Sequence, residues 1–452
     1  MKILQKMLGK STSQNQKNLF QPLLREFIDL NHELVLLGEK MDWNKLEKEF
    51  SILYSNTGAP SKPIRLMCGL LILKQLYGYG DETLMPAWVS NPYFQYFCGE
   101  AHFNWEFPCD PSDLVHFRKR IGSKGVESIF AQSILLHGKS AQTHEICIDS
   151  TAQEKNITFP TDVKLQVKII KGCNKLAKQL EIEQRQNYKF VLKKYLIASR
   201  FGHHPKRRKQ GLKAQRKIKT IAFRLVNELG RKLSPELLEQ NKAQLDIYKK
   251  VLSQKRHDSN KIYSFHEPEV ACIAKGKAHK PYEFGSKVSF GITKTGNIIV
   301  AAVNFKGNPH DSKTLEETLN QHERLTGKRA EGAIVDRGYP GKKMIGETKI
   351  LRADNGKQNT AYQKKKQRGR FKRRAAIEPI ISHTKHQYGM ARNYLKGTAG
   401  DEINAMMAAA AYNFKSWINK TKAKLICAIF CLNNFFKNLL QYIYQTNLRL
   451  SC

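Results

Sequence analysis

Two short apolar segments, each of which runs into an aspartate, do most to limit the folds open to this chain. The first is HEICIDST, in which Ile146 and Ile148 share one face and Asp149 lies on the other. The second is GAIVDRGYPG, which leads into Asp336. Such runs predict buried strands, here each ending in an acid. A lone aspartate there is more often a turn or helix cap. Two of them are stronger evidence for a ligand site, because ligands gather at the carboxyl ends of strands in α/β sheets.

The other segments alternate between helical and strand-like patterns. Residues 1–140 read as all-helical, and residues 164–257 as helical and very basic. The segment PYEFGSKVSFGITKTGNIIVAAVNF predicts a hairpin that turns at Lys294–Asn297. A helix is expected from Asp311, which is predicted to cap it. The alternative is that His310 and Asp311, which follow the third strand, lie near the aspartates. The run KKKQRGRFKRR is expected to be a solvated basic loop before a further helix. This alternation predicts an α/β core.

The net charge indicates a polyanionic partner. Lys and Arg number 77 against 39 Asp and Glu, a formal charge of +38. Nucleic acid fits such a surface best, with anionic membrane and ribosome or chromatin binding as alternatives. The apolar C-terminal stretch LICAIFCLNNFFKNLLQYIY is interrupted by three Asn and one Lys, so a docking helix is expected rather than a membrane span. Nine cysteines without C-x-x-C spacing fit a reducing cytosol, and we expect a cytoplasmic protein.

A third acid, Glu378, follows the basic run. On one continuous helix, Arg374 and Glu378 would lie roughly 40° apart, and Glu378 and Lys385 roughly 20° apart. Phe371 would lie on the same side. Pro379 is well tolerated only in a first helical turn, so a helix that begins near residue 376 covers Glu378 and Lys385 alone. The alternative is an amphipathic helix with an ordinary surface salt bridge.

Three carboxylates suit the cleavage of phosphodiester bonds. The reaction needs an activated water or 3′-hydroxyl and a stabilised leaving oxygen, and two divalent ions provide both. Mg²⁺ prefers oxygen ligands, which carboxylates supply, and Mn²⁺ can replace it. Lys and Arg around such a site neutralise the phosphate backbone.

These motifs together resemble one family, the DDE transposases of bacterial insertion sequences, in the insertion-sequence-five group. CIDSTAQEKNITFPTD is similar to the family's first-aspartate segment and IVDRGYPG to its D-R-G-Y segment. The spacing of Phe371, Arg374, Glu378 and Lys385 matches the signature Y-x-x-R-x-x-x-E-x-x-x-x-x-x-K, with Phe371 in place of the tyrosine. The segment GAPSKPIRLMCGLLILKQLYGYGDE is similar to the family's helical N-terminal domain.

The resemblance implies an α/β fold with an RNase H-like core, a mixed five-stranded sheet with flanking helices. Asp149 would lie on the first strand, Asp336 after the fourth and Glu378 on a helix beyond the sheet. The expected domains are an N-terminal helical DNA-binding domain (1–140), a catalytic domain (141–420) and a helical tail (421–452). The basic helices of 164–257 would form an insertion between the first and second strands.

The resemblance also implies the roles of the site residues. The catalytic residues and ligands of two Mg²⁺ ions would be Asp149, Asp336 and Glu378. The substrate would be double-stranded DNA at the element's terminal inverted repeats and at the target. A homodimer would bind this DNA, and no membrane is expected as a partner. The expected DNA contacts near the cut are Arg337, Phe371, Arg374 and Lys385. The basic charge of segment 164–257, apart from the resemblance, adds Lys206, Arg207, Arg208 and Lys209 as expected DNA contacts.

Three rival functions remain open at this point. An RNase H-fold nuclease would need the same acids but would not rejoin DNA. A decayed or domesticated transposase would only bind DNA, although the three acids are intact. A basic RNA-binding structural protein would give no reason for acids at strand ends.

Overall fold

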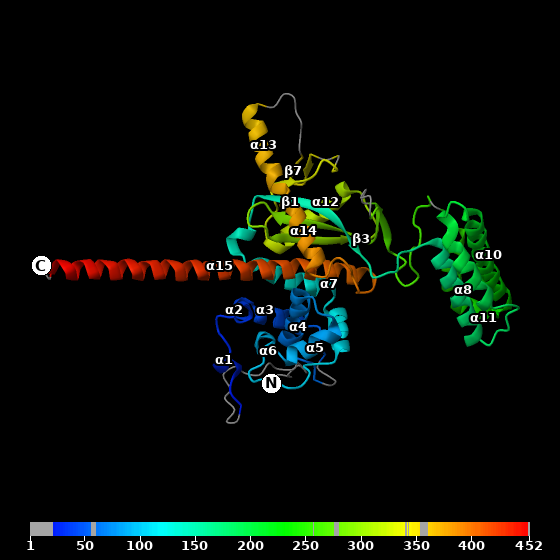
Figure 1. The fold of residues 1–452 in the computed structure, drawn as a ribbon, viewed down its shortest axis with the longest axis horizontal. Coiled ribbons are helices and arrows are strands. Elements are labelled where there is room, and N and C mark those ends of the chain that lie inside the picture. The colour runs from blue at the N-terminus through cyan, green and yellow to red at the C-terminus, as the bar shows by residue number, and fades with distance from the viewer. Residues whose placement is uncertain are drawn as a thin grey trace, which may run out of the picture.

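The structure is a computed structural model that describes residues 21–55, 60–255, 257–274, 280–339, 341, 343–352 and 360–450. A block of N-terminal helices and a mixed sheet both pack on the first part of a long C-terminal helix, α15 (Gly397–Leu450), and a second group of helices stands apart from the sheet (Figure 1). The expected domain boundary at residue 421 falls inside α15, which is continuous there.

The N-terminal block is all-helical in its described part, as expected. Its central helix is buried on nearly every side and ends where predicted, at Gly78, whose φ of 72° favours glycine. The helices are α1 (Leu24–Phe27), α2 (Glu33–Lys40), α3 (Trp43–Ser51), α4 (Ile64–Tyr77), α5 (Asp81–Val89), α6 (Pro92–Phe97) and α7 (Pro111–Leu135).

The sheet has seven strands in the described residues, where five were expected. Its order is β2-β3-β1-β5-β7-β6, and β4 also pairs with β3. Strands β3 and β4 run antiparallel to their neighbours, whereas β5 is parallel to β1 and β7 is parallel to β5. The two strands in excess are the short β2 and β6. The strands are β1 (Glu145–Glu154), β2 (Ala271–Ala274), β3 (Tyr282–Thr293), β4 (Ile299–Phe305), β5 (Gly332–Ile334), β6 (Met344–Ile345) and β7 (Thr348–Leu351).

The hairpin prediction is confirmed, whereas the predicted end of the first strand is wrong. Strands β3 and β4 flank the turn that begins at Lys294. Asp149, however, lies in the middle of β1, because β1 pairs with β3 as far as Glu154. The parallel neighbour β5 pairs only with residues 145–147. Asp149 therefore lies just beyond the end of β5, not at the end of its own strand.

The helices around the sheet differ from the predictions at two points. The basic run 364–374, expected as a loop, belongs to helix α13 (Ala361–Arg374), which Thr360 caps. Helix α14 (Ile377–His386) then begins close to residue 376, so Pro379 lies in a first turn. His310, not Asp311, caps helix α12 (Asp311–Thr326): its ring accepts a hydrogen bond from the Ser312 amide.

The basic segment between β1 and β2 forms a separate helical bundle with its own core (Figure 1). The buried residues include Ile169, Ile221, Leu225 and Leu252. Gly211 allows close packing there, because a Cβ at this position would lie 2.4 Å from the Gly202 amide nitrogen. The elements of this bundle are α8 (Asp162–Gln179), α9 (Lys189–Ser199), the 3-10 helix η2 (Arg200–His203), α10 (Arg208–Lys232) and α11 (Pro235–Ser253). Another 3-10 helix, η1 (Gly138–Ala141), lies outside the bundle and precedes β1. We call residues 162–253 the insertion.

A buried ion pair lies where the chain leaves the sheet for the insertion. Lys155 follows β1, its side chain is 3% exposed, and its Nζ lies 2.7 Å from Asp401 Oδ1 on α15. Glu267, on the chain that returns from the insertion, lies 3.4 Å from the same ammonium group. Both connections of the insertion are thereby tied to α15.

Among the described residues, none of the helices has the length and apolarity needed to span a bilayer.

Candidate active site

Asp149 and Asp336 lie level with each other across the gap beyond β5. Cys147 is the partner of Ile334 in the parallel pairing of β1 with β5. Two residues further along each chain are Asp149 and Asp336, so the register itself brings the two carboxylates together. Ladder pairing thus joins residues that are far apart in the sequence.

One guanidinium contacts both aspartates. Arg374 is the last residue of α13, and its Nη2 lies 3.3 Å from Asp336 Oδ2 and 3.8 Å from Asp149 Oδ2. Its side chain is 15% exposed, and that of Asp149 is 21% exposed. The two carboxylates therefore face one position where a positive charge is stabilised.

Burial strongly affects Asp149. Loss of water around the carboxylate raises its pKa, Arg374 opposes this rise, and the charges of Asp336 and Asp311 add to it. A half-buried carboxylate among other acids is stabilised by a cation. The oxygen donors also suit Mg²⁺, so Asp149 and Asp336 fit the expected metal.

Glu378 does not join this pair in the structure. It lies in the first turn of α14 and is exposed. No group of three or more His, Cys, Asp or Glu side chains among the described residues is placed to hold a metal ion. The assignment of Glu378 therefore rests on the signature spacing.

The signature residues predicted to contact DNA have other neighbours here. Phe371 is half-buried and packs against the main core. Lys385 is 17% exposed, and its Nζ lies 3.7 Å from Glu283 Oε2 on β3. Arg337 is exposed beside Asp336. Arg374 and Arg337 are thus near the acids, whereas Phe371 and Lys385 anchor α13 and α14.

Several polar residues lie near Asp149, and among them the sequence suggested a place near the aspartates only for Asp311. Ser150 Oγ donates a hydrogen bond to Asp311 Oδ1, and Lys287 Nζ lies 2.9 Å from the same oxygen. Tyr339, three residues after Asp336, is 2% exposed. The only sequence signals were the position of Asp311 after the third strand and that of Tyr339 in the D-R-G-Y segment.

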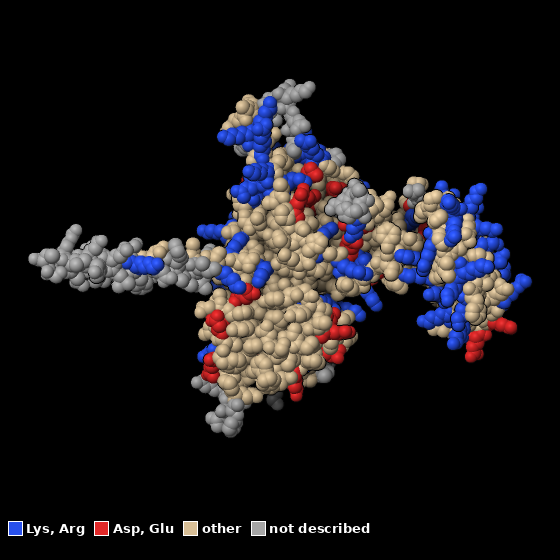
Figure 2. All heavy atoms as spheres, viewed as in Figure 1, with Lys and Arg blue, Asp and Glu red and all other residues tan. Residues whose placement is uncertain are grey.

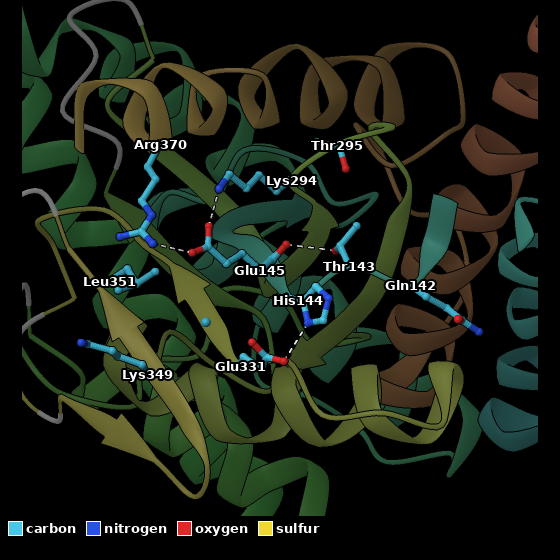
Figure 3. A pocket seen from close by; sticks show the side chains of 11 residues that line it. Gln142, Thr143, His144, Glu145, Lys294, Thr295, Glu331, Lys349, Leu351 and Arg370 are labelled. Carbon is cyan, nitrogen blue, oxygen red and sulfur yellow. Dashed lines mark hydrogen bonds and ion pairs between the residues drawn. The ribbon is translucent and has the colours of Figure 1, made fainter. Parts of the chain in front are cut away.

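A cavity of about 510 Å³ lies near the start of β1 (Figure 3). Glu145 projects into it between Lys294 and Arg370, whose Nη2 lies 2.7 Å from Glu145 Oε1. Burial disfavours the charged carboxylate, but the two cations hold the pKa of Glu145 below its usual value. Glu145 and Asp149 lie on one face of β1, as Arg370 and Arg374 do on α13. The cavity therefore belongs to the contact between β1 and α13 and does not include the three acids.

The basic side chains gather on the insertion (Figure 2). The insertion, residues 162–253, contains 24 Lys and Arg against 7 Asp and Glu. Lys206, Arg207, Arg208 and Lys209 are all exposed there. Residues 21–140, in contrast, contain 12 Lys and Arg against 14 Asp and Glu. The electrostatic footprint for nucleic acid thus lies on the insertion rather than on the N-terminal helices.

Two family models match parts of the chain. Residues 22–120 match the family described as "Transposase domain (DUF772)" and residues 253–414 the family described as "Transposase DDE domain". The second match contains Asp336, Arg374 and Glu378. Asp149 precedes the insertion and therefore lies outside the matched residues.

The chain also matches a curated relative, the "Uncharacterized protein ORF8 in nfe locus" of Rhizobium meliloti. The two are 34% identical over 197 residues, which are 42% of this chain and 95% of the relative. No solved structure matches the chain.

Proposed function

The chain belongs to the transposases that carry a DDE domain, and on that premise we propose that it cuts DNA at the terminal inverted repeats of an insertion sequence and joins the cut ends to target DNA. The DDE domain implies an RNase H-like fold. The observation that carries the proposal is that Asp149 and Asp336 lie at one level of the sheet and both contact the guanidinium of Arg374.

Asp149 and Asp336 would hold divalent metal, Mg²⁺ or Mn²⁺, with Glu378 as the third ligand. Two such ions activate the attacking oxygen and stabilise the leaving oxygen of the phosphodiester. The chain's own part is to hold the two aspartates side by side around a positive charge. Arg374 supplies this charge in the present structure. Once metal ions take its place at the carboxylates, its guanidinium would be available to a DNA phosphate.

The DNA would be gripped mainly by the insertion. Its excess of Lys and Arg supplies non-specific contacts to the phosphate backbone. Arg337, beside Asp336, would contact the strand near the cut. We further propose that the protein acts in the cytoplasm as a homodimer, which would pair the two ends of the element.

The test is cleavage of a DNA duplex that carries the element's end. Asp149→Ala, Asp336→Ala and Glu378→Ala should each abolish Mg²⁺-dependent cleavage while DNA binding, measured by gel shift, is retained. Asp246→Ala, an exposed acid of the insertion, serves as the matched control and should cleave normally.

The outcomes separate the rival functions. Full cleavage by any one of the three variants would refute the assignment of that acid. Cleavage without joining to a target plasmid would reduce the protein to a nuclease. Binding without cleavage by the unaltered chain would reduce it to a DNA-binding protein.

A further inference from the structure

A polar cluster lies next to Asp149, and the proposed function does not use it. It consists of Ser150, Lys287, Asp311 and Tyr339, and we call it the Asp311 cluster. Ser150 Oγ and Lys287 Nζ both bind Asp311 Oδ1, and Lys287 Nζ also donates to the Pro309 carbonyl oxygen at 2.7 Å. The side chain of Lys287 is 12% exposed, and that of Asp311 is 33% exposed. Removing this ion pair partly from water costs free energy, and the hydrogen bonds to Ser150 and Pro309 help to offset that cost.

The cluster draws on the elements that carry the two aspartates. Ser150 follows Asp149 on β1, and Tyr339 follows Asp336 by three residues. Neighbouring strand residues point to opposite faces of a sheet. Strand β5, however, pairs with β1 only as far as Cys147, so the edge of β1 is open beside Asp149 and Ser150. Groups from both faces can therefore act on the same space.

Asp311 has no capping role that would explain its position. His310 accepts the hydrogen bond from the first turn of α12, and Asp311 turns toward β1 instead. Ser150 and Lys287 both bind its Oδ1, which leaves Oδ2 without a partner among the described residues.

A second, independent observation is the buried hydroxyl of Tyr339. The residue is 2% exposed, and its hydroxyl oxygen makes no hydrogen bond of full geometry within the described part of the chain, although Ser150 lies near enough to interact weakly with it. An unpaired buried hydroxyl destabilises the folded chain. Burial raises the pKa of this phenol most, and the charges of Asp149 and Asp311 add to the rise, so the hydroxyl lies close to both acids. A buried donor that lacks a full hydrogen bond near carboxylates can be satisfied by an ordered water or by the hydration shell of an ion.

We propose that Asp311 is a positioning residue of the divalent-cation site formed by Asp149 and Asp336, that its charge strengthens cation binding, and that Lys287 limits this strength. Asp311 acts through its charge and through Ser150 rather than as a direct ligand. The Tyr339 hydroxyl donates to water around the bound cation. The inference rests on the proposed function, because it takes Asp149 and Asp336 as the ligands.

Charge variants of opposite sign test this inference. The probe is Mn²⁺ alone, titrated into the full chain without DNA. Asp311→Asn keeps an acceptor for Ser150 but removes the negative charge, so the Kd for Mn²⁺ should rise roughly fivefold. Lys287→Met removes the counter-ion, so the Kd should fall by a similar factor, roughly fivefold. Glu316→Gln makes the same charge change as Asp311→Asn at an exposed position of α12 and should leave the Kd unchanged.

A purely structural ion pair predicts a different pattern. Breaking it from either side would then shift the Kd in the same direction, or not at all, and either result would overturn the inference. Tyr339→Phe provides a further readout that does not depend on the ion pair. It should raise the Tm of the metal-free chain and reduce the rise in Tm that Mn²⁺ produces, whereas equal Mn²⁺-induced rises in both proteins would exclude a role of the hydroxyl.

Failure of the inference and failure of the proposed function can be told apart. If Asp149→Asn and Asp336→Asn weaken Mn²⁺ binding but Asp311→Asn and Lys287→Met do not change it, only the role of Asp311 is wrong. If Asp149→Asn and Asp336→Asn also leave the Kd unchanged, the cation site itself is wrong.

Discussion

Arg374 Nη2 lies 3.3 Å from Asp336 Oδ2, although Arg374 ends helix α13 and Asp336 lies in the loop that follows strand β5. The same nitrogen lies 3.8 Å from Asp149 Oδ2. The guanidinium thus offsets part of the negative charge of the two acids that would hold the metal. An arginine in this position competes with a metal ion for the carboxylates. When no metal is bound, the arginine holds the two carboxylates together.

The first prediction concerns this competition. Arg374→Ala should tighten Mn²⁺ binding to the chain without DNA, by roughly five- to tenfold, because a unit charge within 4 Å of both ligands is removed. Titration calorimetry measures the Kd. The neighbouring exposed Arg373→Ala is the control and should have little effect. An unchanged or weaker affinity in Arg374→Ala would show that the arginine does not compete with the metal.

The second prediction concerns the insertion. Replacing Lys206, Arg207, Arg208 and Lys209 by Ala should weaken binding to many DNA sequences alike. The slope of log K against log salt should also become shallower, by up to about 0.9 for each phosphate that the protein no longer neutralises. Binding is measured by fluorescence anisotropy at several salt concentrations.

The matched control for the insertion removes the same number of charges from the N-terminal helices. Lys40, Lys45, Lys48 and Lys62 are exposed there, and their replacement by Ala should change the salt slope less. A larger change in this control would place the DNA on the N-terminal domain instead. An unchanged slope in the insertion variant would mean that this basic run does not face DNA.

The third prediction concerns the ion pair at the base of the insertion. Lys155→Met should leave the Asp401 carboxylate buried without its main partner and lower the free energy of unfolding by about 3–5 kcal/mol. Asp401→Leu should have a comparable effect, since it leaves the ammonium group without its nearest carboxylate. The double variant should recover part of the loss, which denaturant unfolding of all four proteins measures. Strictly additive losses would show that the two charges are not coupled.

The fourth prediction concerns pH. Burial lowers the pKa of His322 to about 4, against 6.5 for an exposed histidine, with smaller opposite effects of Glu323 and Arg329. The residue is 2% exposed, and neither ring nitrogen has a hydrogen-bond partner among the described residues. The unfolded chain takes up a proton as the pH falls below 6.5, whereas the folded chain does not do so until about pH 4. The stability that the neutral ring permits is therefore present above pH 6.5 and is lost as the pH falls toward 4.

His322→Leu should flatten this loss, by up to about 1.4 kcal/mol for each pH unit in that window. Unfolding by urea at pH 7, 6 and 5 provides the comparison, and exposed His203→Leu is the control. If the two variants lose stability equally between pH 7 and 5, His322 is not the source of the pH dependence.

The local patterns in the sequence were enough to predict several parts of the fold. The hairpin at Lys294, the helix that ends at Gly78 and the basic helices after β1 follow from periodicity and turn residues, which act over a few neighbours. Wherever an element ends through a contact with a distant segment, the prediction failed. Strand β1 runs past Asp149 because β3 continues to pair with it, and the basic run before Glu378 is helical although it reads as a solvated loop.

The sequence by itself determined which residues are proposed to carry the chemistry, because two aspartates after apolar runs and the signature around Glu378 are visible in the order of residues alone. Only the tertiary structure decided how the two aspartates meet. The register of β1 with β5 sets Asp149 level with Asp336, the packing of α13 places Arg374 between them, and contacts with Ser150 and Lys287 hold Asp311 nearby. The register of β1 with β5 and the contact of Arg374 with Asp149 join chain segments more than a hundred residues apart, which no local pattern encodes.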